Sequence, residues 1–234
     1  NKPVYQYSID AFLDTKSFSK IIIAIPKKLI NVVAEQLAED KYKNVILCEG
    51  GVSRSQSVYN AFSMISGHQN KIFIHDAARP MINKKTILNL IEFSKKEDAV
   101  ILAKKITETV KFVQSKISNF TVDRTNLWIS ETPQVFNQEV LEKVYDKKLD
   151  TIHEYSDEAA LAEDCGYDVI IFENKNPNIK ITTKEDLSEI TKRIDSDNFF
   201  GVGIDFHSLD KGDGIIVGGC KIKCDLKSVA HSDG

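Results

Sequence analysis

Residues 20–62 read KIIIAIPKKLINVVAEQLAEDKYKNVILCEGGVSRSQSVYNAF, and this stretch decides the fold. Its apolar and polar residues predict a buried strand, an amphipathic helix and a second strand, at residues 20–25, 29–38 and 44–48. Two glycines end the second strand, and Ser53 can cap the helix that follows. Strand and helix therefore alternate, which is typical of a mostly parallel sheet with helices on both faces.

The same alternation extends to both sides of this stretch. Further helices are predicted at residues 3–13, 84–93, 139–145, 157–163 and 184–194. Further strands are predicted at residues 71–74, 99–103, 169–172 and 179–181. Short strands at residues 109–113, 120–123 and 127–130 break the pattern and predict an antiparallel arm. The fold class is thus α/β, a doubly wound and mostly parallel sheet with an inserted arm.

A second domain is predicted near the end of the sequence. Ser196-Asp197-Asn198 has the composition of a linker, and residues 199–206 begin a new strand pattern. The segment that follows is too short to bury a core alone. We therefore expect a first domain at residues 1–195 and the start of a second at residues 196–234. Because the sequence opens without Met and closes on the turn-like residues 231–234, we expect both ends to be truncations.

Composition excludes several classes of protein. The 234 residues are 42% hydrophobic and 28% charged, a balance that excludes a disordered chain. The net charge of -3 argues against a nucleic-acid partner, and no apolar run approaches the ~20 residues of a membrane span. The four cysteines lack a zinc-ligand spacing and suit a reducing cytoplasm. A plastid location stays open because any leader peptide would precede Asn1.

Two polar loops follow predicted strands, where ligands bind in open α/β sheets. The first, residues 50–57, combines two glycines and a helix N-terminus with Arg54. The second is residues 75–80, where Asp76 suits Mg²⁺ and Arg79 suits a phosphate. An ordinary capped turn and an Asp–Arg pair that pins a loop would explain the same residues without a ligand.

Basic residues elsewhere extend this phosphate-binding pattern. The chain has only four arginines: Arg54 and Arg79 lie in the two polar loops, and Arg124 lies in a third polar stretch, residues 123–128. Lys180 lies between apolar neighbours on a predicted strand. The alternatives are a cation–π contact of Arg124 with the nearby Trp and a solvated Lys180. Together these residue types predict phosphate chemistry with a metal.

A separate metal motif lies in the predicted second domain. Asp205 and His207 are two residues apart on a predicted strand, so both side chains would point to one face and could hold Zn²⁺ or Mn²⁺. An isolated Asp-x-His pair is also frequent without a metal.

The motifs occur in one order that resembles a known family. They are Gly50-Gly51-x-x-Arg54-x-x-Ser57-Val58, His75-Asp76-Ala77-Ala78-Arg79-Pro80, Glu108-Thr109-Val110-Lys111, Thr132-Pro133-Gln134 and Asn178-Ile179-Lys180-Ile181-Thr182. In this combination residues 2–193 resemble the 2-C-methyl-D-erythritol 4-phosphate cytidylyltransferase family of non-mevalonate isoprenoid synthesis. Residues 203–207, 218–219 and 231–234 are similar to the start of 2-C-methyl-D-erythritol 2,4-cyclodiphosphate synthase. The chain thus resembles a piece of a bifunctional protein.

The resemblance implies an activity and a set of site residues. A Rossmann-like nucleotidyltransferase domain would transfer a cytidylyl group from CTP to methylerythritol phosphate with Mg²⁺. Arg124 and Lys180 match catalytic residues, and Asp76 matches a residue near the metal. The matches to substrate-binding positions are Gly51, Arg54, Ser57, Asp76, Ala77, Arg79, Thr109 and Thr132. In the second, α+β domain, Asp205 and His207 match metal ligands, whereas His231 and Ser232 match substrate contacts.

The resemblance also implies an assembly and a missing segment. The first domain would form a homodimer through its arm, and the complete second domain would form a trimer. The first domain would lack the N-terminal strand and Gly-rich loop of the family, a strand that would lie centrally in the sheet. The parent protein would also cyclise the phosphorylated CDP product and release CMP.

Two other functions remain open on the sequence alone. One is a cytidylyltransferase for ribitol 5-phosphate or another polyol phosphate, which shares the motifs of the first domain but is not expected to carry the tail. The other is a non-catalytic nucleotide-binding module.

Overall fold

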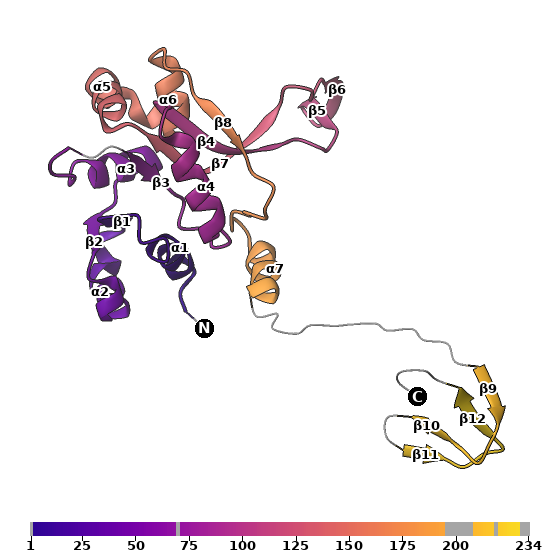
Figure 1. Cartoon of the computed structure of the whole chain (residues 1–234). Helices are drawn as coiled ribbons and strands as arrows, with labels where there is room; N and C mark the ends of the chain where they lie inside the picture. The colour runs from indigo at the N-terminus through magenta and orange to yellow at the C-terminus, as the bar shows by residue number, and fades with distance from the viewer. Residues whose placement is uncertain (1, 69–70, 195–207, 218–219, 230–234) are drawn as a thin grey trace. The chain divides into compact units, whose positions relative to one another are not determined.

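The computed structural model describes residues 2–68, 71–194, 208–217 and 220–229. The chain divides into two units, Asn1–Thr191 and Lys192–Gly234, which are drawn in Figure 1. The division falls inside helix α7 (Lys184–Ile194), near the boundary expected at residue 195. Among the described residues, no helix is long and apolar enough to cross a membrane.

A four-stranded sheet forms the centre of the first unit. Its order is β3 (Ile72–Ile74), β7 (Trp128–Phe136), β4 (Ala99–Lys105) and β8 (Ile170–Glu173). β4 and β8 are parallel, whereas β7 is antiparallel to both of its neighbours. The α/β class is confirmed, but this sheet is mixed, because β7 opposes the other three strands.

Strand β7 is longer than the sequence pattern predicted. It continues through Pro133, which lacks the N–H that a ladder requires. The register with β4 shifts at this point, since Ile101 pairs with Gln134 and Leu102 pairs with Glu131. Thr132 and Pro133 therefore lie in a bulge, the usual way for a sheet to re-aim a side chain.

A second, two-stranded sheet consists of β1 (Ile21–Ile25) and β2 (Val45–Glu49), which pair in parallel. Among the described strands, β1 pairs only with β2, and β3 pairs only with β7. A cavity of about 1020 Å³ reaches both strands, and residues of β1 and β3 line it together with apolar residues of neighbouring helices.

Helices cover both faces of the four-stranded sheet, and two more helices contact the two-stranded sheet. Those on the four-stranded sheet are α1 (Val4–Leu13), α4 (Lys84–Ser94), α5 (Gln138–Lys148) and α6 (Glu158–Asp164). Of the other two, α2 (Ile30–Gln36) contacts β2, and α3 (Arg54–Phe62) contacts both β1 and β2. Short 3-10 helices span Lys27–Leu29, Asp40–Tyr42 and Leu149–Glu154. Alternate residues of β4 face opposite sides, as a pleated strand requires. Ala99 and Ile101 pack with α5 and α6, whereas Leu102 packs with α1 and α4, so the sheet is doubly wound.

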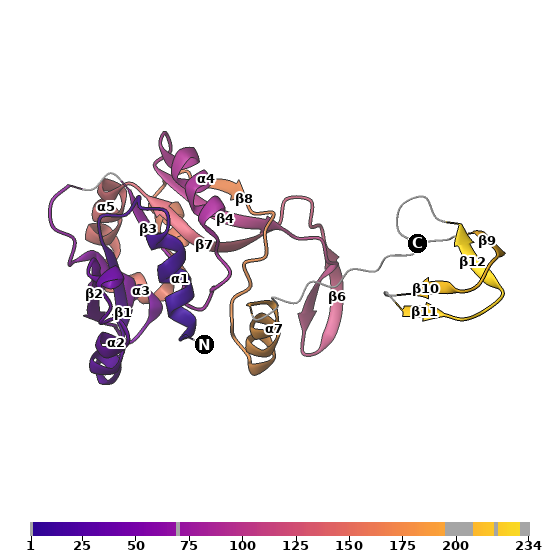
Figure 2. The same cartoon turned by 60° about the horizontal axis from the view of Figure 1, so that its bottom comes forward.

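The predicted arm is present as a hairpin of β5 (Val110–Gln114) and β6 (Ile117–Val122). It extends away from the four-stranded sheet in both views (Figures 1 and 2). Phe112 and Phe120 stack at its centre with ring centroids 5.0 Å apart.

The predicted strand at residues 179–181 was wrong. The described chain is irregular there, and its backbone bonds to a loop instead of a strand. The Ile181 N–H donates to the Ala78 carbonyl oxygen at 2.8 Å, which holds this segment beside the loop after β3.

The described residues of the second unit form two antiparallel strand pairs. β9 (Ser208–Lys211) pairs with β12 (Leu226–Val229), and β10 (Ile215–Val217) pairs with β11 (Cys220–Ile222). The strand expected at residues 199–206 lies outside the described residues.

Candidate active site

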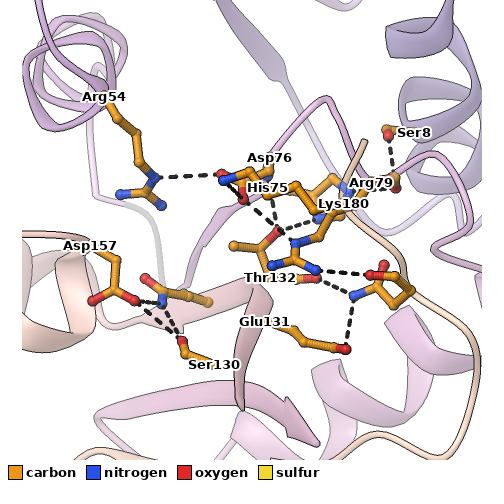
Figure 3. Close-up of polar contacts among 12 residues, drawn as sticks. Ser8, Arg54, His75, Asp76, Arg79, Ser130, Glu131, Thr132, Asp157 and Lys180 are labelled. Carbon is orange, nitrogen blue, oxygen red and sulfur yellow. Dashed lines mark hydrogen bonds and ion pairs between the residues drawn. The ribbon is translucent and has the colours of Figure 1, made fainter. Parts of the chain in front are cut away.

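Three cations surround the carboxylate of Asp76 at the carboxyl edge of the sheet (Figure 3). Asp76 lies in the loop directly after β3. The Lys180 Nζ atom is 3.0 Å from Asp76 Oδ2, and the Arg79 Nε atom is 3.5 Å from the same oxygen. The Arg54 Nε atom is 3.5 Å from Asp76 Oδ1. Four residues from three separate motifs are thus brought together.

The electrostatics of this cluster suit an anionic ligand. Burial raises the pKa of Asp76, but the hydrogen bond from Lys180 and the charges of Arg54 and Arg79 outweigh burial and hold it below its usual range. The carboxylate is therefore ionised at neutral pH. Arg54 shares its charge with a second carboxylate, that of Glu158, whereas Arg79 and Lys180 are both ion-paired with Asp76. Two cations beside one carboxylate can also bind a phosphate group.

A chain of hydrogen bonds fixes the loop that carries Asp76. The Asp76 backbone N–H donates to Thr132 Oγ1 at 3.0 Å, and Thr132 Oγ1 lies 3.0 Å from His75 Nδ1. His75 Nε2 lies 3.2 Å from the Arg79 carbonyl oxygen, which only accepts, so Nε2 carries the proton. Nδ1 then accepts from the Thr132 hydroxyl. Burial lowers the pKa of His75 to about 4, so the ring is neutral near pH 7.

Buried amides connect this loop to the segment that carries Lys180. Asn178 Nδ2 donates to Glu131 Oε2 at 3.1 Å and to the Thr132 carbonyl oxygen at 2.9 Å. Asn174 Nδ2 donates to the same Glu131 oxygen at 2.7 Å. The Arg79 Nη1 atom donates to the Asn178 carbonyl oxygen at 2.8 Å. This network fixes where Arg79 and the chain before Lys180 lie.

The glycine loop between β2 and α3 is held by its own hydroxyls. Ser53 caps α3 as predicted, since its side chain accepts from the Gln56 N–H at 3.1 Å. Ser57 Oγ accepts from the Gly51 N–H at 3.0 Å and donates to the Ser53 carbonyl oxygen at 2.9 Å. A Cβ on Gly51 would lie 2.1 Å from Cγ of Gln56, so only glycine fits there.

The arm residues lie apart from this cluster. The Arg124 Nη1 atom donates to Thr109 Oγ1 at 3.3 Å, and both side chains are exposed. Within the described part of one chain, neither makes a hydrogen bond or ion pair with Asp76, Arg79 or Lys180. Arg124 and Lys180, the two predicted catalytic residues, are therefore not brought together in one chain.

Ala77 and the second-unit residues complete the predicted set. Ala77 follows Asp76 and lines the cavity between β1 and β3, together with Arg54 and Ser57. Asp205, His207, His231 and Ser232 lie outside the described residues.

The donor set around Asp76 suits a metal shared with a ligand. In the part of the chain that is described, no three His, Cys, Asp or Glu residues gather as a metal cage. Mg²⁺ in nucleotide sites often uses one or two carboxylates together with substrate phosphates. The ionised, partly exposed Asp76 carboxylate fits that arrangement, in which the protein supplies one ligand and the substrate phosphates supply others.

Sequence reasoning missed the roles of four polar residues at this site: the partly buried His75 and the buried Glu131, Asn178 and Glu158. Glu158 ion-pairs with Arg54 and is only 1% exposed. The signal for it was its place after the helix-capping Asp157, whose side chain accepts from the Ala160 N–H at 2.9 Å. Spacing along the sequence gave no sign that it meets Arg54.

The first unit is similar to proteins of one known family. The family described as 2-C-methyl-D-erythritol 4-phosphate cytidylyltransferase (IspD) matches residues 1–193. The cytidylyltransferase of that name from Dictyoglomus thermophilum is 35% identical over 189 residues, 79% of this chain and 82% of that protein. The crystal structure of the Francisella tularensis enzyme is similar with a TM-score of 0.71 and 35% identity, and the match covers 81% of this chain and 87% of that chain.

The similarity to one group of relatives extends beyond the first unit. The bifunctional enzyme IspD/IspF of Pelagibacter ubique is 33% identical over 236 residues, which cover 100% of this chain. The match covers 60% of that protein, so this chain spans less than two thirds of it.

The doubly wound sheet and the cations at its carboxyl edge define an α/β nucleotidyltransferase. Within that class, the chain belongs to the 2-C-methyl-D-erythritol 4-phosphate cytidylyltransferase family.

Proposed function

We propose that the first unit transfers the cytidylyl group of CTP to 2-C-methyl-D-erythritol 4-phosphate. A phosphate oxygen of methylerythritol phosphate attacks the α-phosphorus of CTP, the bond to the β-phosphate breaks, and pyrophosphate leaves. The cluster of Arg54, Arg79 and Lys180 around Asp76 is the observation that carries this proposal. Phosphoryl transfer depends mainly on positioning and on neutralising charge, and these cations supply both.

Individual residues have distinct parts in this proposal. Lys180 is 43% exposed and has a mobile ammonium, so it can move from Asp76 to an incoming phosphate. Arg79 is held by the Asn178 carbonyl oxygen and acts as a fixed donor. Ser57 and Ala77 line the cavity where the nucleotide would bind, and Gly51 allows the loop to pack closely against Gln56 beside it. Asp76 would hold Mg²⁺, which supplies charge neutralisation on the phosphates when bound.

We further propose that Arg124 and Thr109 act across a homodimer. Both lie on or beside the arm, away from the Asp76 cluster of their own chain. The arm exposes Phe112 and Phe120 by 49% and 56%, and a second copy of the chain would cover them. A partner arm could then bring Arg124 and Thr109 to the site.

The domain assignment remains a proposal too. Residues 1–195 form the cytidylyltransferase domain, and the cavity between β1 and β3 supports the absence of one central strand with its Gly-rich loop. Residues 196–234 begin a cyclodiphosphate synthase domain. The complete protein would close the phosphorylated CDP product to the cyclodiphosphate, with Asp205 and His207 holding Zn²⁺ or Mn²⁺, His231 and Ser232 contacting substrate, and a trimer as the assembly.

Pyrophosphate release from CTP tests the first-unit activity. It is measured with methylerythritol phosphate and with ribitol 5-phosphate, on the 234-residue chain and on the product of its complete reading frame. Turnover with methylerythritol phosphate alone is expected in the complete product. Lys180→Ala should abolish it, whereas Lys184→Ala, an exposed lysine on α7, should not.

The same assay separates the alternatives. Turnover with ribitol 5-phosphate alone would identify a polyol-phosphate cytidylyltransferase of another specificity. CTP binding without turnover, unchanged by Lys180→Ala, would identify a non-catalytic nucleotide-binding module. Either result would overturn the proposed reaction.

A further inference from the structure

Glu158 is a buried carboxylate near the candidate site that the proposed chemistry does not use. It is the first residue of α6 and is only 1% exposed. Burial raises its pKa, because a charge in a dry environment loses hydration. A carboxylate in such a place requires a compensating partner.

The partner is Arg54, the first residue of α3. The Arg54 Nη1 atom donates to Glu158 Oε2, while the Arg54 Nε atom faces Asp76 Oδ1 at 3.5 Å. Burial alone would lower the pKa of Arg54, but the charges of Glu158 and Asp76 raise it. The guanidinium is thus held between α6 and the loop after β3.

The buried ion pair of Arg54 and Glu158 is not explained by a gain in folding stability. A buried ion pair gains little net free energy, because desolvation offsets the attraction. Among the described residues, Glu158 Oε1 has no hydrogen-bond partner, and neither does the buried Tyr145 hydroxyl, whose pKa is raised first by burial and then by the charge of Glu158. Each unpaired buried group lowers the stability of the fold, a cost that apolar residues would avoid. The feature that the pair does fix is the orientation of Arg54.

We propose that Glu158 is a positioning residue for the transfer reaction, because it holds the Arg54 guanidinium at one edge of Asp76 and leaves the other oxygen of Asp76 to Lys180 and Arg79. This inference rests on the proposed function. Without Glu158, Arg54 can turn its planar fork fully onto Asp76 and form a bidentate pair. Arg54 would then compete with Lys180 for the carboxylate and leave the position it has in the cluster.

The test compares Glu158→Gln with Glu163→Gln in the complete reading-frame product. Both residues lie on α6, but Glu163 is exposed and lies near the opposite end of the helix. Activity is normalised to the folded fraction from thermal unfolding. Glu158→Gln is expected to lower kcat/KM about 100-fold, the scale of a misplacement near reacting groups, while Glu163→Gln stays within about twofold.

A double-mutant cycle shows whether Glu158 acts through Arg54. In an Arg54→Ala background, Glu158→Gln should change kcat/KM by less than about threefold, because the group that it positions is gone. Equal losses in both backgrounds would overturn the proposal, and so would a lowered melting temperature with unchanged kcat/KM. If Glu158→Gln does not fold, Glu158→Asp in the same two backgrounds gives the same comparison.

Different results would overturn the positioning role of Glu158 and the proposed reaction. Absence of turnover in the unsubstituted protein would overturn the reaction itself. Turnover in the unsubstituted protein that Glu158→Gln leaves unchanged would overturn only the positioning role.

Discussion

Lowering the pH should lower the free energy of unfolding of the first unit, because His75 then takes up a proton more readily in the unfolded chain. In the folded chain, burial lowers the pKa of this ring to about 4, whereas an imidazole in an unfolded chain titrates near 6.5. A second proton would go to Nδ1, which accepts from the Thr132 hydroxyl in the neutral ring. Once Nδ1 carries a proton, it can no longer accept from the Thr132 hydroxyl, so that hydroxyl proton loses its acceptor. Thr132 Oγ1 also already accepts from the Asp76 N–H.

The size of the effect follows from proton linkage. Between pH 6.5 and about 4 the unfolded chain binds this proton and the folded chain does not, so stability falls as the pH falls through that window. Each pKa unit corresponds to about 1.4 kcal/mol. Between pH 7.5 and 4.5, His75 should therefore remove about 2–3 kcal/mol from the free energy of unfolding.

Urea unfolding at several pH values measures this loss. The single Trp128 lies on β7, so its fluorescence reports on the first unit. His75→Asn keeps an acceptor for Thr132 and removes the titrating ring, so its stability should depend less on pH by about 2–3 kcal/mol over the same interval. His153→Asn, on an exposed residue, is the control and should retain the full dependence. Equal pH dependence in His75→Asn and the unsubstituted chain would refute this reasoning.

Three further substitutions test the geometry of the site. Gly51→Ala should raise the KM for CTP at least tenfold, because the added carbon would lie 2.1 Å from Cγ of Gln56; a normal KM would show that the loop shifts freely. Asn178→Ala should lower the free energy of unfolding by about 2–3 kcal/mol, since it removes one of the donors to the buried Glu131; denaturant unfolding measures this, and a change below about 0.5 kcal/mol would contradict the network. Asp157→Ala should cost about 2–3 kcal/mol by the same measurement, because α6 loses its capping side chain and the buried Gln134 loses an acceptor; no loss would contradict both roles.

Local sequence signals predicted much of the fold. The apolar run of β1 and the capping residue of α3 are local features, and both were placed correctly. The Thr183 hydroxyl, just before α7, accepts from the Asp186 N–H at 3.2 Å, which is another local hydrogen bond of this kind. Strand β7 was predicted only at residues 127–130, whereas it continues to Phe136 with Thr132 and Pro133 in a bulge opposite β4. That bulge depends on pairing with a distant strand and gives no local signal.

The site residues that could be predicted are those whose residue type and local motif already indicate phosphate or metal binding. Asp76 and Arg79 were chosen for residue type and for their place after a predicted strand, and Lys180 was chosen as a lysine on a predicted strand that the structure does not form; the structure brings the three together. Glu158 and Glu131 were not predicted, since their role depends on partners distant in sequence. The metals, the oligomeric states, the cytoplasmic location and the roles of the second-unit residues stay predictions.

The separation of β1 from β3 has a consequence for how the site responds to a ligand. The glycine loop follows the two-stranded sheet and the Asp76 loop follows the four-stranded sheet, and in the described chain no ladder joins the two. Sheets without shared backbone bonds can open independently, so their amide protons should exchange with solvent at unrelated rates. A nucleotide that contacts both loops would act as a cross-link, and protection of the β1 amides would then rise with the occupancy of the site.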